Sequence, residues 1–135
     1  MNLRTISIGL SSSVLLGIIC FGIYIGPRDN IIDFIFAPFF VLLVAGFPPI
    51  VSMSLSARSK NSISQMILMT TSLLYGIWFA YVANNAFYVH VTSTSAIIIL
   101  FVGIYFLPVS LPLWITAYVI EILYRKKNPN TPAEP

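Results

Sequence analysis

The chain has 135 residues, of which 58% are hydrophobic and only 8% charged, and its formal net charge is +3. A soluble domain carries about 25% charged residues. The few charges of this chain cannot cover a water-facing surface, and the mean hydropathy of +0.92 indicates a surface that mostly faces lipid. The basic residues flank apolar segments and form no separate patch, so we expect no nucleic acid partner.

Four apolar segments come close to the roughly 20 residues that a helix needs to cross a bilayer. They cover about residues 5–25, 31–53, 63–83 and 96–124. We therefore predict an all-α fold, an integral membrane bundle of four transmembrane helices within residues 1–124. Residues 125–135 are basic and then rich in proline, which predicts a disordered cytoplasmic tail.

The first segment has no charged residue and carries a stripe of small residues. Gly9, Ser13 and Gly17 are spaced by four, so they share one helix face. Small residues let transmembrane helices approach each other closely. No A-x-A-like cleavage site follows the segment, so we expect a retained helix in place of a cleaved signal peptide.

The second segment is interrupted by Pro38, Gly46, Pro48 and Pro49. Prolines are tolerated within a bilayer when neighbouring groups satisfy the carbonyls that they leave without a partner. We predict a proline-kinked helix that spans the membrane. The alternative is a re-entrant loop, which would leave three spans.

The third segment carries a second stripe of small residues, Ser72, Gly76 and Ala80. In a four-helix arrangement the first and third helices run in the same direction, so the two stripes could pack in parallel. We favour packing within the chain, with homodimerisation as the alternative.

The fourth segment contains Pro108 and Pro112, one turn apart, and Glu121 near its end. The prolines predict a bend, which we interpret as a static kink. The alternative is a hinge or gate. Glu121 and Arg125 have the spacing of an ion pair on one helix face. Glu121 is also the acid nearest to hydrocarbon, which makes it the candidate for any proton or ion coupling.

The distribution of Lys and Arg predicts the orientation, because these residues accumulate in cytoplasmic loops. With the N-terminus inside, only Arg28 lies outside. The residues inside are then Arg4, Arg58, Lys60, Arg125, Lys126 and Lys127. We predict a multi-pass protein of the cell membrane with both ends in the cytoplasm, and the bacterial inner membrane is the expected location.

No group of residues points to catalysis, a cofactor or a metal. His90 is the only histidine and Cys20 the only cysteine, whereas a zinc site needs three or four ligands. We therefore expect a protein that is not an enzyme, with neither a cofactor nor a metal.

We recognise no specific family. The size and number of spans are similar to those of small multidrug transporters and small fluoride channels. The first helix lacks the embedded acid of the former and the arginine-containing motif of the latter. Immunity proteins against pore-forming toxins can also have four spans and no catalytic residues, a similarity of architecture that matches no motif.

We predict a non-enzymatic interaction protein, an accessory or inhibitory subunit that binds another membrane protein or itself within the lipid bilayer. The reason is that the sequence contains residues suited to helix packing but no group of residues suited to catalysis or ligand binding. The alternative is a homo-oligomeric channel or transporter for a neutral or weakly polar solute, suggested by the bent fourth helix and by the hydroxyls of Thr70, Thr71 and Ser72.

Overall fold

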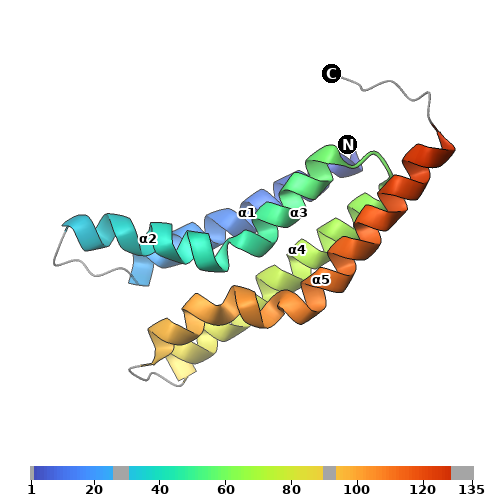
Figure 1. Ribbon diagram of the computed structural model, residues 1–135. Helices are drawn as coiled ribbons and strands as arrows, with labels where there is room; N and C mark the ends of the chain where they lie inside the picture. The colour runs from blue at the N-terminus through green and yellow to red at the C-terminus, as the bar shows by residue number, and fades with distance from the viewer. Residues whose placement is uncertain (1, 26–30, 90–93, 129–135) are drawn as a thin grey trace.

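The structure is a computed structural model that describes residues 2–25, 31–89 and 94–128 (Figure 1). These residues are helical throughout and contain no strand, which confirms the predicted fold class at that level. The elements are α1 (Leu3–Ile25), α2 (Ile31–Ala45), α3 (Phe47–Arg58), α4 (Ser62–Asn84), the π-helix η1 (Asn85–Val89) and α5 (Ser95–Lys127).

Three stretches of helix are long and apolar enough to cross a membrane. They are Leu3–Ile25, Ser62–Val89 and Ile97–Lys127. The pair formed by α2 and α3 also passes this test but is bent by 61°, so the described residues hold three such spans, or up to four if the bent pair is one span. Large apolar side chains cover the outside of the helices, Phe36, Phe39 and Leu43 of α2 among them, as expected for membrane association.

The second predicted segment differs most from its expectation, because two helices replace one kinked helix. The break lies at Gly46, and Pro48 and Pro49 follow in the first turn of α3. A proline there removes an N–H that has no partner within the helix, so these two prolines begin a helix and do not kink one. Helix α3 then continues to Arg58, and the predicted connector over residues 54–62 shortens to Ser59–Asn61.

The other boundaries lie close to their predicted positions. Helix α5 runs to Lys127, so residues 125–127, which we assigned to the disordered tail, are helical. The π-helix η1 occupies part of the connector predicted after the third segment. The connector at 26–30 and the tail from 129 onward lie outside the described residues.

Helices α1 and α4 lie side by side and run in the same direction, as expected for the first and third segments. Ser11 meets Ser72 near the middle of both helices, and Phe21 meets Phe79 further along, with ring centroids 5.5 Å apart. The larger core cluster surrounds these contacts with side chains from α1, α2, α4 and α5. Its most buried members include Ile18, Tyr75, Ile99 and Val102.

Buried serines link the helices to one another. Ser7 of α1 and Ser56 of α3 lie 2.7 Å apart at their hydroxyl oxygens, and so do Ser11 and Ser72. The indole N–H of Trp114 in α5 donates to Ser52 of α3 at 3.0 Å. Such bonds hold helices together where lipid provides no hydrophobic drive for association.

Replacing Ser11 by alanine is expected to lower the free energy of unfolding by roughly 0.5–1.5 kcal/mol, the range for hydrogen bonds between transmembrane helices. Unfolding by a denaturing detergent in mixed micelles measures it. Ser13→Ala is the matched control, because the exposed Ser13 hydroxyl donates only to the Gly9 carbonyl of its own helix. Equal effects of the two changes would show that the Ser11–Ser72 contact adds no stability.

Candidate functional site

The first candidate site is a groove of about 490 Å³ between α1 and α4. Four residues of the two predicted stripes line it, Ser13 and Gly17 from α1 and Gly76 and Ala80 from α4. The remaining lining residues are Val14, Phe21, Phe79, Ala83, Asn84 and Tyr88. The groove is mostly apolar and lies on helices that are long enough to span a bilayer.

The stripe on α1 does not face the interior of the protein. The face of α1 that is buried carries Ser7, Ser11, Ile18 and Gly22. A Cβ atom placed on Gly9 or on Gly17 would meet nothing within 4 Å. These two glycines therefore lie against open space in the described part of the chain, and packing of this stripe stays a prediction.

The stripe on α4 does contact α1. Ser72 is buried against Ser11, and a Cβ atom on Gly76 would lie 3.0 Å from a methyl group of Val14. Ala80 and Asn84, further along α4, are exposed along the groove. The side-chain amide of Asn84 has no hydrogen bond with any residue that the structure describes, and within a bilayer such an amide favours a partner.

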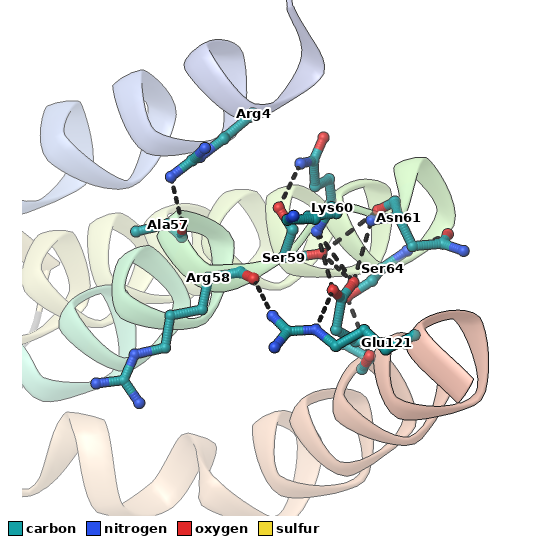
Figure 2. A network of polar contacts seen from close by, with 11 residues as sticks. Arg4, Ala57, Arg58, Ser59, Lys60, Asn61, Ser64 and Glu121 are labelled. Atoms are coloured by element: carbon teal, nitrogen blue, oxygen red, sulfur yellow. Dashed lines mark hydrogen bonds and ion pairs between the residues drawn. The ribbon is translucent and has the colours of Figure 1, made fainter. Parts of the chain in front are cut away.

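The second candidate site lies at the opposite end of the bundle, where the α3–α4 turn meets α5 (Figure 2). The carboxylate of Glu121 accepts hydrogen bonds from the Ser59 hydroxyl at 2.9 Å and from the backbone N–H groups of Lys60 and Asn61 at 3.1 Å. It also pairs with Arg125 at 2.9 Å, as the spacing of four predicts. We call Glu121, Arg125 and the turn Ser59–Asn61 the turn clamp.

Two arginines also bond to the end of α3 next to the turn clamp. Arg4 donates to the carbonyl of Ala57, and Arg125 donates to the carbonyl of Arg58. These carbonyls belong to the last turn of α3, where helix carbonyls have no partner within the helix and the helix dipole favours a cation. These bonds link the start of α1, the end of α3 with its following turn, and the end of α5, which lie at the same end of the bundle in Figure 1.

A cavity of about 250 Å³ lies beside the turn clamp. Its polar wall is formed by Arg58, Ser59, Ser64, Glu121 and Arg125. Its other wall is formed by Leu55, Leu68, Ala117, Tyr118 and Ile122. The cavity is therefore amphipathic, with the cations Arg58 and Arg125 near the ends of α3 and α5 and apolar side chains further inside these helices.

The structure gives Glu121 a role that its sequence position did not reveal. Both carboxylate oxygens accept hydrogen bonds, and the side chain is only 9% exposed. The proposed part in proton or ion coupling stays a prediction. No sequence motif marks Ser59 or the turn, although a polar turn between two spans, with an acid near the end of a later span, is a signal that could have been followed.

The prolines occupy contrasting places. Pro48 and Pro49 are buried, whereas Pro108 and Pro112 are exposed on α5, which stays one helix through both. Pro38 lies inside α2 and faces Gly22, where a Cβ atom would be 2.9 Å from the proline Cα. The hinge or gate at Pro108 and Pro112 remains a prediction.

The residues considered for chemistry do not come together. Among the described residues, no three His, Cys, Asp or Glu side chains gather as metal ligands would. Cys20 is exposed, and His90 lies outside the described residues. Comparison with protein-family models, with curated proteins and with solved structures finds no match to the chain.

Proposed function

We propose that the protein is a non-enzymatic, four-span membrane protein that binds a transmembrane helix of another membrane protein in the groove between α1 and α4. The observation that carries the proposal is the pair of small-residue stripes that border this groove, of which the one on α1 faces outward. An accessory or inhibitory subunit is the class of protein that fits such a surface.

The chemistry of the groove defines the partner. Helices associate in lipid through close van der Waals packing and hydrogen bonds, and Gly17 and Ala80 leave room for a helix backbone to approach. Asn84 offers an amide at one end of the groove. The expected partner is an apolar helix with small residues at intervals of four and a hydrogen-bonding side chain level with Asn84.

We also propose that both ends of the protein lie in the cytoplasm and that α2 and α3 form one bent span. The support is the gathering of basic residues at one end of the bundle, since such residues accumulate on the cytoplasmic side. Arg4, Arg58 and Arg125 converge there on or beside the α3–α4 turn. A multi-pass protein of a bacterial inner membrane fits this charge pattern.

The test is recovery of the partner from native membranes in a mild detergent. Gly17→Leu fills the groove without an internal clash, because its Cβ atom meets nothing within 4 Å. We expect the recovery of a stoichiometric membrane protein to fall about tenfold or more, since buried contacts at an interface centre dominate affinity. Gly76→Leu is less informative, because it would also press on Val14.

Gly9→Leu is the matched control, because it makes the same change on the same helix at a position that is equally open but outside the groove. Its partner recovery should stay close to that of the unchanged protein. Undiminished recovery with Gly17→Leu would contradict the proposed groove. Recovery of a second copy of the chain in place of another protein would move the proposal to a homo-oligomer.

A further inference from the structure

The cavity beside the turn clamp combines features that a soluble ligand would not need. Two arginines are among the residues that line it, together with apolar side chains of helices that are apolar enough to span a bilayer. The cavity volume of about 250 Å³ is below the roughly 300–1,000 Å³ of pockets that enclose a drug-sized ligand, so it can take a headgroup and the first carbons of a lipid, and not a whole lipid.

The charge around the cavity is strongly positive. Six of the seven Lys and Arg residues lie at this end of the bundle, at the start of α1, the end of α3, the following turn and the end of α5. Among the residues that the structure describes, Glu121 is the acid at this end, and its carboxylate contacts both the turn and Arg125. The distribution of Lys and Arg predicted these six residues on one side, and the fold brings Arg58 and Arg125 to one cavity.

Arg58 is the cation of this group that lines the cavity and is not used in the turn clamp. Its guanidinium makes no hydrogen bond or ion pair with any described residue, although its side chain lines the cavity. Figure 2 shows it extending away from the contacts of Glu121. Arg125, in contrast, uses its Nε and one terminal nitrogen within the turn clamp.

We propose that this cavity binds the headgroup of an anionic phospholipid, with the phosphate held by Arg58 and by the remaining edge of Arg125. A guanidinium presents two parallel N–H groups that match phosphate oxygens, and it gives up its hydration more readily than an ammonium does. The first part of an acyl chain then lies along Leu55 and Ile122. The aliphatic wall is the reason to assign a lipid and not free phosphate.

The site is independent of the proposed partner groove, which lies in the other half of the bundle between α1 and α4. A protein that lost one function would keep the other. Failure of the Gly17→Leu experiment and failure of the lipid experiment are therefore separate results.

The experiment is native mass spectrometry of the full chain in detergent micelles, titrated with phosphatidylglycerol or with phosphatidylcholine of the same acyl composition. We expect one phosphatidylglycerol to be retained per chain. Arg58→Gln should weaken that binding about tenfold, because it removes a charge-assisted contact to phosphate. Lys127→Gln is the matched control, since it removes the same charge from the same end without lining the cavity.

Three results would overturn the proposal. Equal weakening by Arg58→Gln and Lys127→Gln would show attraction to surface charge alone. Equal retention of phosphatidylcholine would show that the phosphate charge is not recognised. Displacement of the lipid by inorganic phosphate at equal concentration would assign the site to a free anion.

Arg58→Lys is the second variant, in case the glutamine variant does not fold. It keeps the charge but lacks the planar fork, so its affinity should fall to about a third of the original. Unchanged affinity with Arg58→Lys would overturn the assigned arginine–phosphate contact.

Discussion

Replacing Glu121 by glutamine should lower the free energy of unfolding by about 2–3 kcal/mol, the cost of weakening several hydrogen bonds to a charged and mostly buried acceptor. The carboxylate accepts hydrogen bonds from the Ser59 hydroxyl and from the N–H groups of Lys60 and Asn61. A glutamine amide has one acceptor oxygen and turns two donors toward groups that also donate. The attachment of the α3–α4 turn to α5 would then be weakened, and the bond from Arg125 to the Arg58 carbonyl would remain.

Unfolding in mixed micelles of a mild and a denaturing detergent measures the difference. Arg125→Gln is the companion variant, and its effect should be about 1 kcal/mol or less, because its side chain is 55% exposed. A Glu121→Gln protein as stable as the original would contradict a structural role. It would then favour the proton or ion coupling predicted from the sequence, which needs the acid for activity and not for folding.

Replacing Gly46 by alanine should destabilise the protein by roughly 2–3 kcal/mol, in the range for atoms forced into a packed interior. Gly46 is buried between α2 and α3, and a Cβ atom there would collide with the carbonyl oxygen of Leu42. That carbonyl also accepts the Gly46 N–H at 2.8 Å, so it cannot move aside without breaking a bond. The bend of 61° between the two helices would have to change.

The same unfolding measurement applies, with Gly17→Ala as its control. Gly17 lies within α1, and a Cβ atom there would meet nothing within 4 Å. Since alanine favours a helix over glycine by about 1 kcal/mol, this control should be neutral or slightly stabilising. Equal stability of the Gly46→Ala protein would show that the junction does not depend on the missing side chain.

The number and approximate bounds of most helices could be predicted from the sequence, because a long apolar segment can adopt few structures in lipid. The second segment shows where that reasoning ends. Pro48 and Pro49 are compatible with a kink inside one helix or with the first turn of a new one. The decision depends on how closely the Leu42 carbonyl approaches Gly46, and that is a property of the folded backbone.

The faces of α1 were beyond prediction for a related reason. Ser7 and Ser11 repeat at the same interval of four as Gly9, Ser13 and Gly17, so spacing cannot say which stripe is buried. The hydroxyls of Ser56 and Ser72 decide it, because they face α1 and need partners. Counting Lys and Arg residues predicted that the basic residues lie on one side. The contacts of Glu121 with the turn could be seen only in the folded chain.

The turn clamp also has a consequence for the order in which the protein is made. The Ser59 hydroxyl meets Glu121 across 62 positions of the chain, and the Arg58 carbonyl meets Arg125 across 67. While a ribosome is still producing α5, the α3–α4 hairpin has neither of these residues to hold it. The hairpin therefore stays unfinished until the end of α5, which is synthesised after it, supplies these contacts.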